Sequence, residues 1–387
     1  MIREVLLLAS LAAVVFPVSI ASAQRSGTAN RPGFDQLLQA AEKARDENRD
    51  DEAVRLFRRA LSEKPDSEEV LWYLGSLLYE KEQFAEARDV LRQFMTLRPD
   101  AGPGWALLGL SEFQLREYSR ALDHLQRGMA DGLGGRKGLV QTVYYDAVIL
   151  LTRFERYDDS MDMLQKMLAS GDSVPGLLEP AGLAGLRLPY LPAEIPPDQR
   201  NLIALAGKAV MAAQTEHYEE ADLDLVRLVE AYPHQPGVHF LRGAYLAQLH
   251  PQEAVPEFER ELEISPFHVL ARVRLAQQLV TDGEFDRALA LAQQAIQLDP
   301  KRASAHMMAG EALIAKADEA GGIRELEAAR EIDPSIARIH WDLLRAYAAV
   351  GRKEEAGREK KEIERLFHGD SNHPQSLGDS SHDSPTP

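Results

Sequence analysis

The chain has 387 residues, which is enough for two or three ordinary domains or for one long repeat array. Its apolar content of 45 % is that of a folded protein, and the abundance of Leu, Ala, Glu and Arg favours helix. The absence of cysteine excludes disulfides, thiolate metal sites, a cysteine nucleophile and a lipid anchor on cysteine. The formal net charge of −17 argues against binding to nucleic acid or to an anionic membrane, because an acidic surface repels phosphate groups.

The N-terminus has the pattern of an export signal. Arg3 gives a short positive start, an apolar run covers residues 5–20, and three small residues precede Gln24. This pattern predicts a cleaved signal peptide and a periplasmic or extracellular location, most simply in a bacterial envelope. An uncleaved anchor is the alternative, but the run is short and contains Pro17. No later segment reaches the roughly 18–20 apolar residues of a membrane span, so we expect no span in the mature chain.

Prolines recur at a nearly constant spacing along the chain. A step of roughly 34 residues separates Pro65 from Pro99, and nearly the same step recurs along a later series, namely Pro233, Pro266, Pro300 and Pro334. Proline ends a helix because it lacks an N–H and clashes with the preceding turn. A period of this length marks a helical repeat architecture.

Each period contains two amphipathic helical patterns. In the second period, Leu71, Leu74 and Leu78 lie on one helix face, and Phe84 opens a second helix that ends before Pro99. Small residues recur in the first helix at Ala41, Gly75, Gly109, Ala209, Gly243, Ala276 and Gly310, and in the second at Ala53, Ala87, Ala121, Ala221, Ala254, Ala288 and Ala356. We expect the two helices to cross closely at these positions.

The segments 71–99, 104–129 and 273–300 resemble tetratricopeptide repeats. They share with that family a Trp or Leu, a Leu-Gly or Leu-Ala step, an aromatic before the turn, two alanines and, in two of the three, the terminal Pro. Nine copies are recognisable near 34–67, 68–101, 102–135, 141–172, 202–234, 235–267, 269–302, 303–336 and 337–367. The resemblance implies an all-α fold, a right-handed α-solenoid of helix-turn-helix repeats.

Individual copies depart from the pattern. The third ends in a glycine-rich stretch at 131–138 in place of proline. The fourth has Ser160 and the eighth has Gly322 where the others have alanine, and the sixth is one residue short around His250. These departures affect single repeat boundaries and leave the architecture unchanged.

The expected organisation has six parts. They are a signal peptide (1–23), a flexible leader (24–33), an N-terminal block of about four repeats (34–170), a joint (171–200), a C-terminal block of about five repeats (201–367) and a disordered tail (368–387). The joint holds six prolines but is too apolar for a free linker, so we expect it to pack as an ordered segment. A mobile linker is the alternative. The charged last helix is typical of a capping repeat.

The sequence lacks the common motifs of catalytic and nucleotide-binding sites. The sequence has no HExxH, no GxSxG and no GxxxxGK[ST]. The glycines of 132–138 do not follow a strand pattern, which favours a flexible turn over a phosphate cradle. The tail histidines, His368, His373 and His382, are irregularly spaced, so we expect no metal, no cofactor and no catalytic residue. His306 and His340 begin first helices, where packing between repeats is the ordinary explanation.

The resemblance implies that the first helix of each pair lines a concave groove. On that basis the predicted partner-binding residues are Trp72, Tyr73, Tyr79, Leu107, Leu110, Phe113, Tyr145, Arg274, Gln277, Met307, Met308, Trp341 and Arg345. Aromatic, Met and Arg side chains suit an apolar or helical peptide. The alternative is that many of them are core residues between adjacent helices. Positions that clamp a terminal carboxylate in some family members are mostly apolar or acidic here, which argues against that mode.

These observations predict a non-enzymatic scaffold that binds a polypeptide partner and assembles a complex of the cell envelope. One alternative is an accessory subunit that recruits substrates for a separately encoded enzyme, and another is a holdase chaperone. An enzyme with its site in 131–138 or 171–200 is the least favoured hypothesis. The sequence indicates neither the partner nor the oligomeric state.

Overall fold

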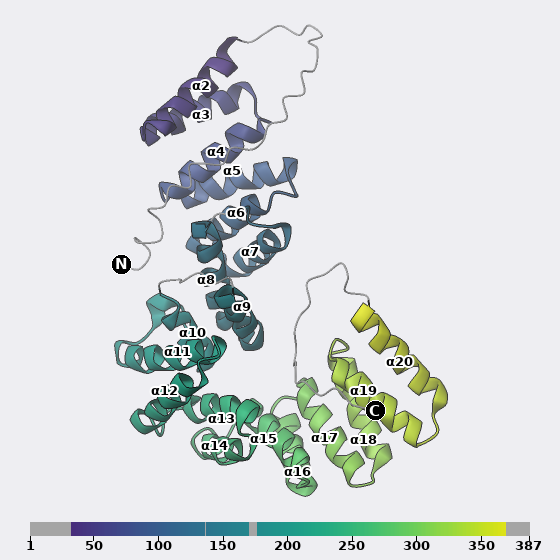
Figure 1. Cartoon of the computed structure of the whole chain (residues 1–387). Coiled ribbons are helices and arrows are strands. Elements are labelled where there is room, and N and C mark those ends of the chain that lie inside the picture. Colours follow the sequence, from purple (N-terminus) through teal and green to yellow (C-terminus); the bar gives the residue numbers. More distant parts are fainter. Residues whose placement is uncertain (1–31, 136, 170–175, 369–387) are drawn as a thin grey trace. The chain divides into compact units, whose positions relative to one another are not determined.

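The computed structural model describes residues 32–135, 137–169 and 176–368. These residues form 19 α-helices and two short 3-10 helices, and they include no strand (Figure 1). The observation confirms the predicted all-α fold. The predicted signal peptide, and almost all of the predicted leader and tail, lie outside the described residues.

The chain divides into two compact units. The first comprises residues up to Ala184 together with Leu188–Ile195, and the second comprises Gly185–Arg187 and the chain from Pro196 onward. The helices of the first unit are α2 (Pro32–Asp46), α3 (Asp50–Glu63), α4 (Glu68–Glu80), α5 (Phe84–Leu97), α6 (Gly102–Gln114), α7 (Tyr118–Asp131), α8 (Lys137–Arg153), α9 (Tyr157–Ala169), most of α10 (Leu178–Gly185) and η1 (Pro192–Glu194).

The second unit contains η2 (Pro197–Gln199), α11 (Arg200–Gln214), α12 (Tyr218–Ala231), α13 (Val238–Leu249), α14 (Pro251–Ile264), α15 (Val269–Thr281), α16 (Phe285–Leu298), α17 (Ala303–Ala315), α18 (Glu319–Ile332), α19 (Ala337–Ala349) and α20 (Lys353–His368). In both units successive helices pack in pairs, from α2 with α3 to α19 with α20. The predicted block boundaries stay a prediction, since the division into two units falls inside the predicted joint.

Small side chains set the crossing of each pair, as the repeat pattern predicts. A Cβ atom added to Gly75 would lie 2.8 Å from the side chain of Leu91, and one added to Gly310 would lie 2.7 Å from that of Leu326. The recurrent alanines of the second helices are all buried: Ala53, Ala87, Ala121, Ala221, Ala254, Ala288 and Ala356. The two helices therefore approach until their backbones leave no room for a larger residue.

The two exceptions to this alanine pattern are accommodated in different ways. Ser160 is fully buried, and its hydroxyl hydrogen-bonds to Thr152 Oγ1 at 2.8 Å and to the carbonyl of Val148 at 3.1 Å. Gly322 lies against Gly310, whose carbonyl oxygen would be 2.8 Å from an added Cβ. The buried hydroxyl is thus satisfied, and the paired glycines allow an especially close crossing.

A hydrogen bond to the proline carbonyl joins each of five repeats to the turn before it. The donor is always the side chain six residues after the proline, and we call this contact the proline clasp. The clasps are Trp105 Nε1 to Pro99 (3.0 Å), His239 Nε2 to Pro233 (3.1 Å), Arg272 Nη2 to Pro266, His306 Nε2 to Pro300 (3.1 Å) and His340 Nε2 to Pro334 (2.9 Å). A carbonyl that the proline turn leaves without a helical partner is satisfied in this way.

The clasp histidines also reach the second helix of their own repeat. Their Nδ1 atoms lie 2.6–2.7 Å from a glutamate, in the pairs His239 with Glu257, His306 with Glu325 and His340 with Glu359. Each of these imidazoles therefore links a turn, a first helix and a second helix. This geometry agrees with the expectation that His306 and His340 are packing residues.

The described part of the predicted joint is densely packed. Its apolar side chains Leu177, Leu183, Leu186, Leu191 and Ile195 are buried, whereas Leu178 is exposed. Within the first unit, Arg153 Nη1 donates to the carbonyl of Pro189 at 2.7 Å and pairs with Glu194 at 3.1 Å. Residues 170–175 lie outside the described part, so the role of the segment as a joint stays a prediction.

We predict that His340→Ala lowers the free energy of unfolding by about 1–3 kcal/mol, because it leaves the Pro334 carbonyl and the buried Glu359 without this hydrogen-bond partner. The measurement is urea denaturation followed by circular dichroism. The matched control is His217→Ala, since His217 is exposed and its ring bonds to Thr215 alone among the described side chains. Equal losses in the two variants would show that the clasp does not contribute to stability.

Candidate functional site

The first helices of neighbouring repeats contact one another within each unit. In the first unit α4 contacts α6 and α6 contacts α8, and in the second unit α13, α15, α17 and α19 contact in series. The first helices from α4 to α8 in the first unit, and from α13 to α19 in the second, therefore form continuous surfaces. We call this surface of each unit the first-helix face. Repeat proteins bind extended partners on surfaces of this kind.

Seven of the predicted groove residues belong to the core. They are Trp72, Tyr79, Leu107, Leu110, Phe113, Met307 and Met308, and none is more than 8 % exposed. The aromatic members pack against second helices, with ring centroids 5.5 Å apart for Trp72 and Phe94 and 5.6 Å apart for Tyr79 and Phe84. The prediction that these seven side chains line an open groove is wrong, because they are buried among the helices of the array.

The other six predicted residues are accessible to different degrees. Tyr73, Tyr145, Arg274 and Gln277 are half-buried. Arg274 donates to Gln277 Oε1 at 3.2 Å, so these two lie together on α15. Trp341 and Arg345 are exposed on α19. Their role in binding a partner stays a prediction.

Carboxylates occupy the first-helix face of the first unit. Burial raises the pKa of Glu42 on α2, and the neighbouring charges of Glu69 on α4 and Asp46 raise it further, while Arg45 lowers it. Glu42 lies late in its first helix, and Glu69 lies in the first turn of the next one. Because the negative charges of these carboxylates repel one another, a cationic group bound beside them would be stabilised.

The same pair of repeat positions holds opposite charges in the second unit. Glu311 lies late in α17 and Arg338 lies in the first turn of α19, and Arg338 Nη2 is 2.9 Å from Glu311 Oε2. Arg338 and Arg345 both pair with Asp342, whose side chain is buried. Burial raises the pKa of Glu311 to about 7, which Arg338 opposes and Asp342 reinforces. Neither Glu311 Oε1 nor Asp342 Oδ2 has a hydrogen-bond partner among the described residues.

The helical pattern alone did not reveal these charged pairs. The spacing of the repeats could have revealed them. A position late in one first helix and a position early in the next first helix are neighbours in each repeat pair, so charged residues at both positions are candidates for an ion pair. The set predicted from the sequence consisted mainly of aromatic and other apolar residues, and seven of these are buried.

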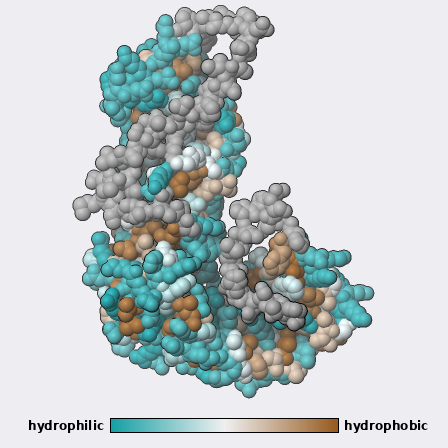
Figure 2. Space-filling view, in the orientation of Figure 1, coloured by the Kyte–Doolittle hydropathy of each residue, from teal (hydrophilic) through white to brown (hydrophobic). Residues whose placement is uncertain are grey.

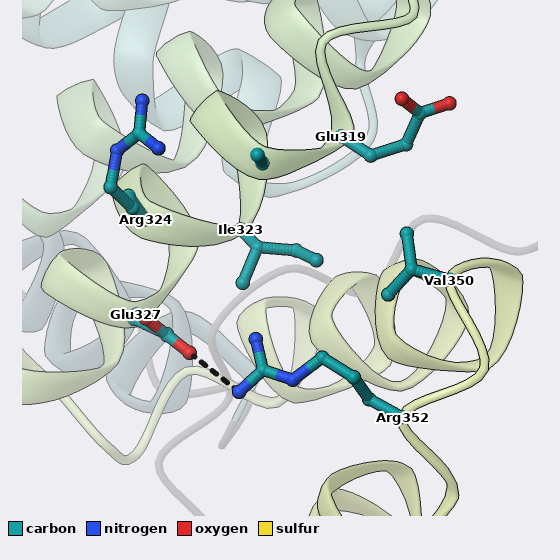
Figure 3. A pocket seen from close by; sticks show the side chains of 7 residues that line it. Glu319, Ile323, Arg324, Glu327, Val350 and Arg352 are labelled. Atoms are coloured by element: carbon teal, nitrogen blue, oxygen red, sulfur yellow. Dashed lines mark ion pairs between the residues drawn. The ribbon is translucent and has the colours of Figure 1, made fainter.

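Other surface features are small or dispersed. On the face shown in Figure 2, hydrophilic residues predominate and apolar patches are interspersed among them. A shallow recess of about 500 Å³ in the second unit is lined by Glu319, Ala320, Ile323, Arg324, Glu327, Val350 and Arg352. Figure 3 shows the guanidinium of Arg352 directed at Glu327, 3.6 Å away. The lining combines two carboxylates and two guanidinium groups with the apolar side chains of Ala320, Ile323 and Val350.

Metal and membrane features are missing from the described residues. No group of three or more His, Asp or Glu side chains in that part of the chain could hold a metal ion. The side chains of His368, His373 and His382 lie outside it. None of the helices described is both long and apolar enough to cross a bilayer. At the glycine-rich stretch, α7 ends at Asp131 and positive φ angles at Gly132, Gly134 and Gly135 form a turn before α8.

Models of the tetratricopeptide repeat family match this chain in both units. One matches residues 44–110, and a second matches residues 243–303 and 273–334. The chain is a tetratricopeptide repeat protein. Its repeats carry the recurrent small residues at the helix crossings described above, and the described residues form helix pairs over the matched ranges.

No curated protein matches the chain. Among solved structures it is similar to a double mutant of MamA from RS-1 (20 % identity, TM-score 0.41), to MamA from Desulfovibrio magneticus RS-1 (20 %, 0.41) and to a further MamA structure (16 %, 0.39). These similarities cover 44 %, 45 % and 46 % of this chain and 97 %, 98 % and 98 % of those chains. At this identity and TM-score the similarity carries no conclusion about function.

We predict that Glu311→Gln becomes more stable relative to the wild type as the pH rises. The unfolded carboxyl loses its proton near its ordinary pKa of 4.5, whereas the folded carboxyl keeps it until about 7. The wild type therefore loses stability between these pH values, and glutamine does not titrate. The relative gain between pH 4.5 and 8 is about 3 kcal/mol in the free energy of unfolding.

The measurement is urea denaturation of both proteins at several pH values. The exposed Glu219→Gln on α12 serves as the control, and its curve is expected to run parallel to that of the wild type. A parallel curve for Glu311→Gln would contradict the raised pKa.

Proposed function

We propose that this protein is a non-enzymatic scaffold that binds a polypeptide partner along its first-helix face and assembles a complex of the cell envelope. One observation carries the proposal. First helices of consecutive repeats contact one another in each unit, so side chains at one repeat position lie in a row on a single surface. A row of this kind suits an extended or helical polypeptide better than a compact small molecule.

The chemistry of the described residues supports a binding role. The carboxylates with perturbed pKa values lie at repeat positions on helices, where burial and neighbouring charges explain the shifts. In the recess of the second unit, the charged side chains of Glu327 and Arg352 pair with each other in a salt bridge. Shape and charge complementarity, and not a reaction, would then be the source of activity.

The envelope location is supported by the sequence of the N-terminus. Its positive start, apolar run and small residues before Gln24 are the features of an export signal. The acidic composition, with a net charge of −17, is consistent with a protein that stays clear of anionic surfaces.

We predict that a photoreactive amino acid on the first-helix face captures the partner and that one on a second helix does not. The sites on the face are Ser76 and Gln277, which occupy the repeat position of Glu42 and Glu311. The matched control sites are Ser62 on α3 and Gln293 on α16, which are exposed on second helices. The measurement is irradiation in an extract of the source cells, followed by mass spectrometry of the cross-linked products.

The expected result is one protein that is cross-linked from Ser76 or Gln277 and not from the control sites. Circular dichroism establishes that each labelled chain keeps its helix content. Equal cross-linking from first and second helices, or from the second helices alone, would overturn the proposed binding surface.

A further inference from the structure

Trp341 differs in exposure from the residues that occupy the same repeat position, counted from the proline of each repeat. The corresponding residues Trp72, Ala106, Phe240, Val273 and Met307 are between 0 % and 8 % exposed, whereas Trp341 is 46 % exposed. In an inner repeat, Phe240 at this position stacks on His268 at the start of the next first helix, with ring centroids 4.7 Å apart. In the last repeat α19 has no first helix after it within the described residues. A large aromatic side chain thus remains where a neighbouring helix would pack.

Trp341 belongs to a stripe along one side of α19. Arg338, Trp341, Arg345 and Ala348 follow at steps of three, four and three residues, and all four are exposed. This spacing places them on one helix face. We call the stripe the α19 edge. A terminal repeat that only caps an array has a polar outer face, so an exposed tryptophan there indicates a binding surface.

The two arginines give the α19 edge its charge. The side chains of Arg338 and Arg345 are 46 % and 76 % exposed, yet the Nη2 atom of each pairs with a carboxylate that is at most 11 % exposed. Arg338 pairs with Glu311, and Arg345 pairs with Asp342. The carboxylates pair with the guanidinium groups of the residues before and after Trp341 in the stripe, and since one guanidinium has five N–H donors, each exposed arginine has the capacity for further hydrogen bonds.

We propose that the α19 edge docks an amphipathic helix of a partner polypeptide, with an apolar residue on Trp341 and acidic residues on Arg338 and Arg345. The helical form follows from the array itself, in which α19 packs on α17 and Arg338 of α19 pairs with Glu311 of α17. The acidic character follows from charge complementarity with the two guanidinium groups. This inference names a site and a partner chemistry for the scaffold function and so rests on the proposed function.

A second copy of the chain fits the α19 edge less well. The first described helix of the array, α2, exposes Asp35, Gln36, Gln39 and Lys43, whereas its large apolar side chains Phe34, Leu37 and Leu38 are half-buried, so it offers Trp341 a mainly polar surface. Two α19 edges facing each other would bring four arginines together, which like-charge repulsion disfavours. A partner of a different sequence is therefore the better occupant.

The test uses the full chain and a synthetic probe. The probe is a fluorescently labelled peptide with the sequence of residues 68–80, EEVLWYLGSLLYE, because α4 is an amphipathic first helix with three glutamates. A second peptide replaces these glutamates by lysine and keeps every apolar residue. Binding is measured by fluorescence anisotropy against the wild type, Trp341→Ala, Arg345→Glu and the control Leu223→Ala, in which a comparably exposed apolar residue on α12 of the same unit is removed.

The expected result is that the acidic peptide binds at least about 10-fold more tightly than the basic one, and that Trp341→Ala and Arg345→Glu each weaken binding at least about 10-fold. Leu223→Ala leaves binding unchanged. No binding of the acidic peptide to the wild type, equal binding of both peptides, or unchanged binding by Trp341→Ala would overturn the proposal. Circular dichroism of each variant excludes loss of fold as the cause.

Two further outcomes would overturn the proposal by assigning the edge to a different occupant. A wild-type dimer that Trp341→Ala dissociates in analytical ultracentrifugation would assign it to a second copy. Binding that becomes at least about 10-fold tighter when the chain ends at His368 would assign it to the C-terminal segment. The scaffold function is tested separately, since cross-linking from Ser76 in the first unit does not involve α19.

Discussion

The close crossing of two helices in each repeat is the constraint on which the rest of the structure depends. At Gly75 and Gly310 the second helix lies so near that no Cβ atom would fit without a shift of Leu91 or Leu326. This approach fixes the pair as a rigid unit and brings the proline turn within reach of the next first helix. The clasps at His239, His306 and His340 then join each turn to the following repeat. Helix crossing and clasp together determine which sides of a first helix are covered and which remain open.

The sides of the first helices that no other helix covers differ in charge between the two units. Around Glu42 and Glu69 the first unit has neighbouring carboxylates, whereas the corresponding pair in the second unit is the salt bridge between Glu311 and Arg338. The α19 edge then adds Arg345 beside Trp341. A single repeat framework therefore carries surfaces of different charge, and under the proposed scaffold function each surface would select for a different sequence in the partner.

The fold could be predicted from the sequence because the fold depends on spacing. The prolines and the small residues at the crossings are periodic, and the described pairs of helices follow that period. Exposure depends instead on what packs next to a residue. Trp72 and Trp341 occupy the same repeat position, but only Trp341 is exposed, since the chain supplies no further first helix beyond α19 in the described part.

The wrong prediction of the groove residues also arises because exposure depends on packing. The family resemblance assigned aromatic residues of first helices to a groove, but Trp72 packs on Phe94 and Tyr79 packs on Phe84 inside the repeat layers. The charged pairs at Glu42 and Glu311 were recognisable only after the repeat position of each side chain was known.

Hydrogen exchange with mass spectrometry tests the central claim most directly, which is that binding takes place on first helices and follows their charge. The full chain is exposed to a set of peptides that share one apolar helical template and differ only in net charge. The account predicts that basic peptides protect α2 and α4, that acidic peptides protect α19, and that the second helices α3, α5 and α16 stay unchanged. Protection of the second helices, or protection that does not depend on the charge of the peptide, would contradict it.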